Sequence, residues 1–142
     1  MNIVELLVST TSRLPNHPVI HFRKELITYQ QLQDKVFRVA AGLKSRGVQK
    51  GMNVALMITN RPEYIVTYFA ILSNGGTVVP INPAFKEREV THIVNDSESE
   101  FLIIEDASKP EVEKAMGQLK TIKEIINLSD VEDERFVSWN VR

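Results

Sequence analysis

Histidine is the side chain used most often for proton transfer and zinc binding near neutral pH. The sequence has three: His17, His21 and His92. His17 and His21 are four residues apart, but they lie in a predicted loop and a predicted strand, so no helix presents both to one metal ion. A catalytic triad can be assembled from distant residues, but the G-x-S-x-G turn that exposes a nucleophilic serine is absent. We therefore predict structural or exposed roles for the three histidines.

Acidic residues flank one predicted strand. Glu98 and Glu100 precede it, and Glu105 and Asp106 follow it. Carboxylate oxygens are ligands for hard cations, so these four could bind one. Charged residues beside a strand are more commonly exposed loop residues. We interpret the four acids as an exposed rim and predict no metal site.

Phosphate binding by a loop requires glycines that let backbone N–H groups approach the phosphate. Neither G-x-x-x-x-G-K-[ST] nor G-x-G-x-x-G occurs. The pair Gly75-Gly76 follows a predicted helix instead of preceding one, so we expect it to end that helix and admit the next strand. The aromatic residues Tyr64, Tyr68 and Phe69 have helical spacing, which favours core packing. These residues predict no catalytic, cofactor-binding or metal-binding site.

The composition is that of one globular domain. The chain has 142 residues, of which 43% are hydrophobic and 25% charged. The 17 basic and 18 acidic residues nearly balance, so nucleic acid is not expected as a partner. The chain has no cysteine, which excludes disulfides and thiolate chemistry. No apolar run approaches the ~20 residues of a membrane span, and the N-terminal segment is not a signal peptide, so we expect a cytoplasmic protein.

The N-terminal part of the sequence predicts two helices and a β-hairpin. Asn2 and Glu5 are placed to cap a helix over residues 2–12. Thr28 and Gln31 form a T-x-x-Q capping box, in which each side chain binds the other residue's backbone N–H. The remaining elements predicted here are strands at 19–22 and 26–28 and a helix over 29–46.

From residue 54 onward, short apolar runs alternate with helical patterns. Continuous apolar runs are typical of strands covered on both faces, as in a parallel sheet. A further capping box, Ser108 and Glu111, predicts the start of the last helix. We therefore expect an α/β fold, with a mostly parallel sheet flanked by helices, plus the N-terminal hairpin. The predicted strands are 54–58, 77–80, 101–104 and 122–128, and the predicted helices are 60–73, 86–96 and one that follows Ser108.

The last 14 residues differ in composition from the rest. We assign residues 1–128 to the α/β subdomain and 129–142 to an acidic connector and tail. Residues 130–135 contain four acids and one arginine, which indicates an exposed connector. The segment 136–142 carries Phe, Trp and two valines, so we expect it to pack against something.

Three stretches, in this order, resemble one protein family. The stretches are ITYQQL at 27–32, with AAGL at 40–43 and GVQKG at 47–51; VALMI at 54–58, with NRPEY at 60–64 and FAIL at 69–72; and GGTVVPINP at 75–83. Together they resemble the opening of the adenylate-forming (AMP-binding) superfamily, which includes acyl- and aryl-CoA synthetases, firefly luciferase and peptide-synthetase adenylation domains. The first and third match the first two core motifs of that family. Met52 and Ser73-Asn74 depart from the residues common in the family, at positions not expected to touch substrate.

The resemblance implies a Rossmann-like N-terminal subdomain of a much longer enzyme. That enzyme would use ATP and Mg²⁺ to convert a carboxylic acid into an acyl-adenylate, and then CoA to form a thioester. The residues around Asn82-Pro83 are most similar to those of fatty-acid–CoA ligases. In the family, the phosphate loop, the adenine and ribose contacts and the catalytic lysine lie beyond the position of Arg142.

We therefore interpret the chain as an inactive N-terminal fragment that acts as a scaffold, with the remainder of the enzyme as its partner. We also expect a homodimer formed through apolar surface that the remainder would otherwise cover. The alternatives are a stand-alone interaction or regulatory module of the same fold, or a small unrelated nucleotide-binding enzyme, for which no phosphate loop is found.

Overall fold

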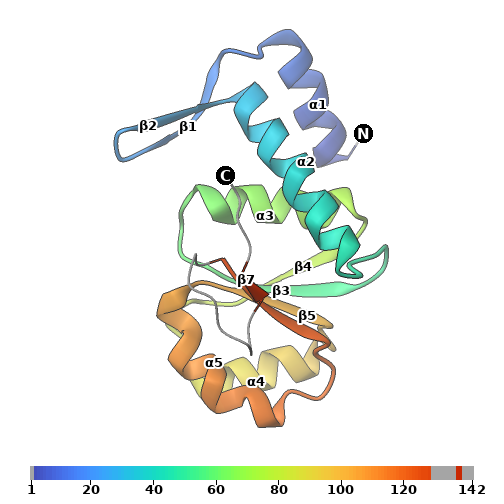
Figure 1. Cartoon of the computed structure of the whole chain (residues 1–142), viewed down its shortest axis with the longest axis vertical. Coiled ribbons are helices and arrows are strands. Elements are labelled where there is room, and N and C mark those ends of the chain that lie inside the picture. The colour runs from blue at the N-terminus through green and yellow to red at the C-terminus, as the bar shows by residue number, and fades with distance from the viewer. Residues whose placement is uncertain (1, 129–136, 139–142) are drawn as a thin grey trace.

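The computed structural model describes residues 2–128 and 137–138 (Figure 1). A helical part with a β-hairpin precedes a parallel sheet that carries helices on both faces. The predicted connector at 130–135 lies outside the described residues, as does the predicted tail apart from Val137–Ser138. No helix in the described part is both long enough and apolar enough to cross a membrane.

The predicted caps of both N-terminal helices are confirmed. Helix α1 spans Ile3–Arg13, and the Glu5 N–H donates to Asn2 Oδ1 at 2.8 Å. Helix α2 spans Tyr29–Ser45; the Gln31 N–H donates to Thr28 Oγ1 at 3.2 Å, and the Thr28 N–H donates to Gln31 Oε1 at 2.9 Å. Each box satisfies backbone donors that a helix start leaves free. Between these helices lies an antiparallel hairpin, formed by β1 (Pro18–Phe22) and β2 (Glu25–Thr28).

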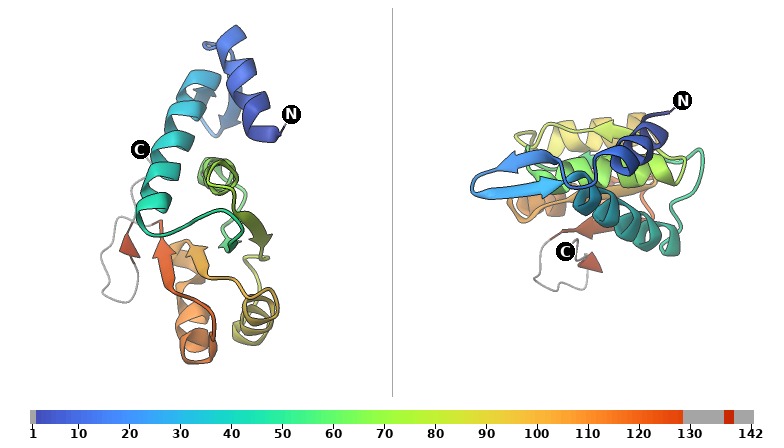
Figure 2. Two further views of the ribbon diagram at one scale, coloured as in Figure 1. Left: turned by 90° about the vertical axis from the view of Figure 1, so that its right-hand side faces the viewer. Right: turned by 90° about the horizontal axis from the view of Figure 1, so that it is seen from above.

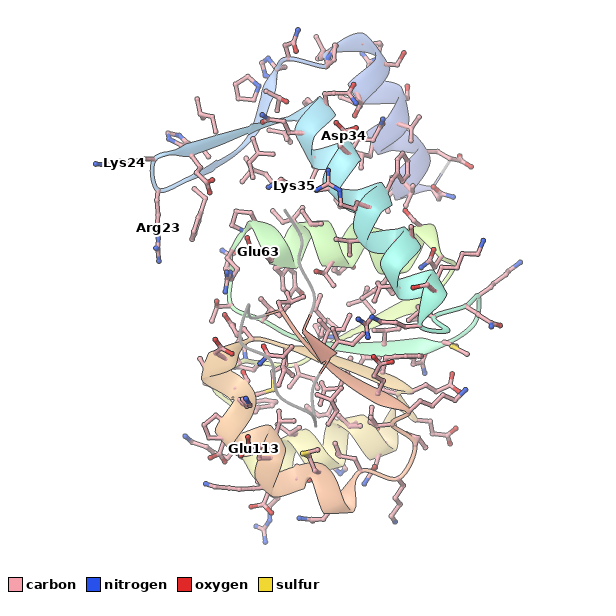
Figure 3. All side chains as sticks on the ribbon, in the orientation of Figure 1. Arg23, Lys24, Asp34, Lys35, Glu63 and Glu113 are labelled. Carbon is pink, nitrogen blue, oxygen red and sulfur yellow. The ribbon has the colours of Figure 1, made fainter. Side chains whose placement is uncertain are left out.

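The hairpin extends away from the sheet and carries basic residues at its tip. Figure 3 shows Arg23 and Lys24 at the turn, away from the other labelled side chains. Arg23 has a φ of +56°, and its guanidinium lies 5.1 Å from the centroid of the Phe22 ring. A tight turn with one left-handed residue thus joins two short strands, as the charged turn in the sequence predicts.

In the described part of the chain, the sheet has five parallel strands in the order β4-β3-β5-β6-β7. The α/β fold predicted from the sequence, with a mostly parallel sheet and an N-terminal hairpin, is therefore confirmed. The strands are β3 (Asn53–Met57), β4 (Thr77–Pro80), β5 (Phe101–Ile104), β6 (Glu124–Asn127) and β7 (Val137–Ser138). The helices between them are α3 (Pro62–Ser73), α4 (Glu87–Asp96) and α5 (Lys109–Ala115), with short 3₁₀ turns η1 (Asp106–Ser108) and η2 (Met116–Gln118).

Alternate residues of the central strands belong to two separate cores. On β3, Val54 and Leu56 pack in the core with α2 and α3, whereas Ala55 and Met57 pack in the core with α4 and α5. Strand β5 alternates in the same way. Because successive strand residues point to opposite faces, a continuous apolar run is needed to fill both cores. Figure 2 shows the two helical layers on either side of the sheet.

The glycine pair ends α3, as predicted. Gly75 has a φ of +79°, and its carbonyl accepts the Gly51 N–H at 3.0 Å. Gly76 leads directly into β4, and the N–H of the next residue, Thr77, donates to the Met52 carbonyl at 2.8 Å. The pair therefore turns the chain tightly and seats β4 beside β3.

The predicted capping box at Ser108 and Glu111 is wrong. Ser108 has helical backbone angles, because the turn η1 extends the helix N-terminally, and an N-cap side chain requires an extended backbone. Its buried Oγ has no hydrogen-bond partner in the described structure. Glu111 instead accepts the N–H of Glu87 at 3.0 Å, and Lys114 Nζ lies 2.9 Å from its carboxylate. These contacts lower the pKa of Glu111, the Lys114 hydrogen bond most strongly, and tie α5 to the start of α4.

Candidate functional site

The order of the strands singles out the carboxyl ends of β3 and β5. Strand β3 leads through α3 to β4 on one side, and β4 leads back through α4 to β5 on the other side. Helices α3 and α4 pack in different cores, on opposite faces of the sheet. In open α/β sheets, a reversal of this kind leaves a crevice beyond the carboxyl ends of the two strands, where ligands commonly bind. This switch point is therefore the candidate site.

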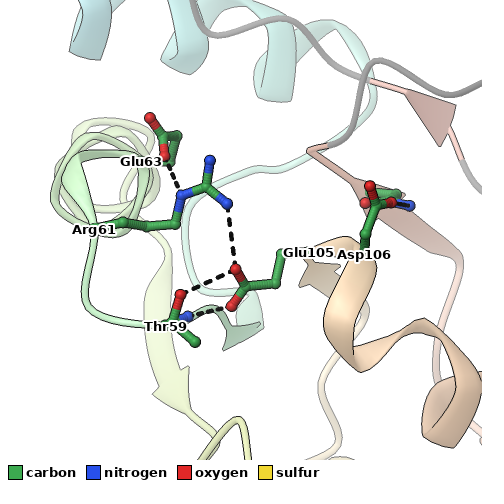
Figure 4. A network of polar contacts seen from close by, with 6 residues as sticks. Thr59, Arg61, Glu63, Glu105 and Asp106 are labelled. Atoms are coloured by element: carbon green, nitrogen blue, oxygen red, sulfur yellow. Dashed lines mark hydrogen bonds and ion pairs between the residues drawn. The ribbon is translucent and has the colours of Figure 1, made fainter.

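A buried carboxylate bridges the switch point. Glu105 follows the last residue of β5 and is 7% exposed. It accepts hydrogen bonds from the Thr59 backbone N–H and, at 3.0 Å, from Thr59 Oγ1, both just beyond β3 (Figure 4). Arg61 Nη1 adds a third bond at 3.2 Å. The carboxylate thus joins the two strand ends across the switch point.

Arg61 lies between two carboxylates. Its Nε donates to Glu63 in the first turn of α3, while its Nη1 reaches Glu105. Burial works against the positive charge, but the attraction of Glu63 and Glu105 outweighs it and raises the pKa of Arg61. The guanidinium is therefore held in its charged form between the two acids.

A second polar pair extends the site toward β6. The fully buried Asn127, at the end of β6, donates through Nδ2 to Asp106 Oδ1 at 3.0 Å. Asp106 is exposed and directly follows Glu105. Side chains at or just beyond the ends of β3, β5 and β6 thus connect the carboxyl ends of these three neighbouring strands.

The charges at this site are mainly negative. Arg61 faces Glu63 and Glu105, and Asp106 adds a further carboxylate nearby. The hydrogen bonds of Thr59 to Glu105 already use the donors that could otherwise hold a ligand anion. The described residues contain no group of three histidines or acids placed to hold a metal ion. The site is therefore a polar junction whose donors already have acceptors, and not a ready pocket for a polyphosphate.

The four acids considered from the sequence lie at opposite ends of the sheet. Glu98 is exposed, and Glu100 forms an ion pair with Lys123 at 3.1 Å near the amino end of β6. The interpretation as an exposed rim fits Glu98 and Asp106. It is wrong for Glu105, because the buried carboxylate is satisfied by groups far away in the sequence.

The histidines and aromatic residues do not enter the candidate site. His17 stacks on Tyr29 with ring centroids 6.3 Å apart, and His21 and His92 are exposed on β1 and α4. Tyr64 and Tyr68 have ring centroids 6.1 Å apart and, with Phe69, pack against the core. The roles of Thr59 and Asn127 were not predicted, because no sequence motif distinguishes these residues.

Comparison with known proteins gives one family. The profile of the family described as AMP-binding enzyme matches residues 8–141. Among curated proteins, the long-chain-fatty-acid–CoA ligase of Bacillus subtilis is 30% identical over 128 residues, which are 90% of this chain and 22% of that protein. Bacitracin synthase 3 of Bacillus licheniformis is 31% identical over 105 residues, which are 74% of this chain and 2% of that protein.

Solved structures give the same result. The anthranilate CoA ligase AuaEII, solved in complex with anthranoyl-AMP, superposes with a TM-score of 0.91 at 25% identity. The match covers 97% of this chain and 27% of that one. The chain therefore spans about a quarter or less of the length of these relatives.

Proposed function

Because the chain belongs to the AMP-binding enzyme family, we propose that it is the N-terminal scaffold of an acyl-CoA synthetase. The longer enzyme would join a carboxylic acid to AMP with release of pyrophosphate, and then transfer the acyl group to CoA. The observation that carries this proposal is the family match over nearly the whole chain. We also propose that the remainder of that enzyme is the partner of this segment and that it acts in the cytoplasm.

A fatty acid is the substrate class we propose. The long-chain-fatty-acid–CoA ligase of B. subtilis is one of the curated relatives, and it aligns with 90% of this chain at 30% identity. The Asn82-Pro83 step after β4 also favours this class. Aryl acids and amino acids are the competing substrates, because an anthranilate ligase and peptide synthetases are among the relatives.

The residues at the switch point do not fit ATP. Glu105 occupies the donors of Thr59, and Glu63 shares the guanidinium of Arg61. A triphosphate placed here would meet several carboxylates and one shared positive charge, which is unfavourable for an anion. We therefore assign no step of the reaction to this chain, and propose that ATP, Mg²⁺ and CoA bind residues elsewhere in the longer enzyme.

An assay of the longer protein that contains this sequence tests the proposal. In the presence of CoA, we expect pyrophosphate release from ATP that depends on medium- or long-chain fatty acids. Anthranilate and a mixture of amino acids should give much lower rates in the same assay. Release that depends only on amino acids, or no release with any acid, would contradict the proposed function.

A further inference from the structure

The contacts of Glu105 have the arrangement of an anion-binding site. Three donors of different kinds converge on its carboxylate: a backbone N–H, a hydroxyl and a guanidinium. All three come from the segment after β3, whereas Glu105 comes from β5. The carboxylate is therefore bound by one segment as an external ligand would be, although it belongs to the same chain.

The two carboxylate oxygens have separate partners. Oε2 accepts a hydrogen bond from the Thr59 N–H, while Oε1 accepts hydrogen bonds from the Thr59 hydroxyl and from Arg61 Nη1. This division matches a planar group with two oxygens, and charge-assisted hydrogen bonds of this kind are stronger than neutral ones. Thr59 is exposed and the Arg61 side chain is 40% exposed, so the donors belong to residues that contact solvent, although Glu105 itself is nearly buried.

We propose that the switch point is a carboxylate-binding cradle, formed by Thr59 and Arg61, which Glu105 keeps occupied. A free carboxylate binds there only when Glu105 is displaced or removed. This proposal concerns the described residues alone and does not depend on the proposed enzyme function. The ligand class is a small carboxylate, and the carboxylate of Glu105 normally takes its place.

Replacement of Glu105 by alanine makes the proposal testable. The change Glu105→Ala removes a CH₂–COO⁻ group, which has the heavy atoms of acetate, and leaves the three donors without an acceptor. Thermal unfolding of the 142-residue chain is followed in sodium acetate and in sodium chloride at equal ionic strength and neutral pH. We expect the variant to unfold at a lower temperature than the wild type in chloride, and acetate to raise that temperature.

The expected size of the effect follows from binding to the folded state alone. At an acetate concentration about ten times its Kd, the ratio of folded to unfolded protein rises roughly 10-fold. The wild type should show no difference between the two salts, because Glu105 already occupies the cradle. The change Thr59→Val in the Glu105→Ala background removes the hydroxyl donor and should weaken the acetate effect.

Two control variants distinguish the cradle from a general salt effect. Glu100→Ala removes the same group at the opposite end of the sheet, where its ion pair is with Lys123, and should show no response to acetate. Glu105→Gln fills the cradle with a neutral amide of the same size. It should remain folded, be less stable than the wild type and not respond to acetate.

Three results would overturn the proposal. The first is a folded Glu105→Ala variant with the same unfolding temperature in acetate and chloride. The second is a Glu105→Ala variant that stays unfolded in both salts, since acetate bound in the cradle should restore its folding. The third is a larger stabilisation by inorganic phosphate than by acetate or formate, which would show that the cradle does not select a carboxylate.

Discussion

Gly75 is the residue whose backbone most clearly requires glycine. Its φ is +79°, and an added Cβ would lie 3.0 Å from Lys50 Cβ. We predict that Gly75→Ala lowers the free energy of unfolding by more than about 1 kcal/mol, because alanine is strained in the left-handed region and also meets Lys50. Urea unfolding of the chain measures this change.

Gly117 provides the matched control for this substitution. An added Cβ at Gly117 meets nothing within 4 Å, and this glycine has no left-handed φ. The change Gly117→Ala should therefore alter the free energy of unfolding by no more than about 0.5 kcal/mol. Equal losses for the two glycines would show that backbone conformation does not determine the requirement at Gly75.

At the scale of an element, the two serine or threonine positions predicted as helix caps should behave differently. Thr28 Oγ1 accepts the Gln31 N–H, so Thr28→Ala should cost about 1 kcal/mol of stability. Ser108 Oγ has no partner, so Ser108→Ala should cost nothing or stabilise the protein slightly. Chemical unfolding of the two variants checks the contrast. A loss at Ser108 as large as that at Thr28 would contradict the description of α5.

The order and type of the elements could be predicted because their signals are local. Capping boxes join residues three apart, and apolar runs such as 54–58 and 101–104 mark buried strands without knowledge of their neighbours. The box at Ser108 failed because a 3₁₀ turn before α5 changed the backbone at that residue. Sequence spacing alone does not show where a helix gains an extra turn.

The candidate site could not be predicted in the same way. The bond between Thr59 and Glu105 joins residues 46 apart, and the bond between Asn127 and Asp106 joins residues 21 apart. Both depend on parallel pairing that brings the carboxyl ends of β3, β5 and β6 together. Strand order is a property of the whole sheet, so an acid after a strand does not reveal whether it is exposed or bound.

At the scale of the whole molecule, apolar side chains are exposed on α1 and on the hairpin. Leu6 on α1 is 51% exposed and Val19 on β1 is 37% exposed, and the two side chains line one apolar groove between these elements. Exposed apolar clusters favour association, so we predict that the isolated chain forms a homodimer through this surface. Light scattering should show a dimer that Leu6→Lys weakens and that His92→Lys, on the exposed face of α4, leaves unchanged. A strictly monomeric chain at high concentration would contradict the prediction.

We propose that this chain forms part of the frame of an AMP-binding enzyme and that the groups that hold the nucleotide lie elsewhere in the longer enzyme. Calorimetric titration of the folded 142-residue chain with ATP and Mg²⁺ tests this. Because Glu63 and Glu105 already share the charge of Arg61, we predict no heat beyond that of dilution. Saturable binding with a micromolar Kd would contradict the claim and place a nucleotide site within these residues.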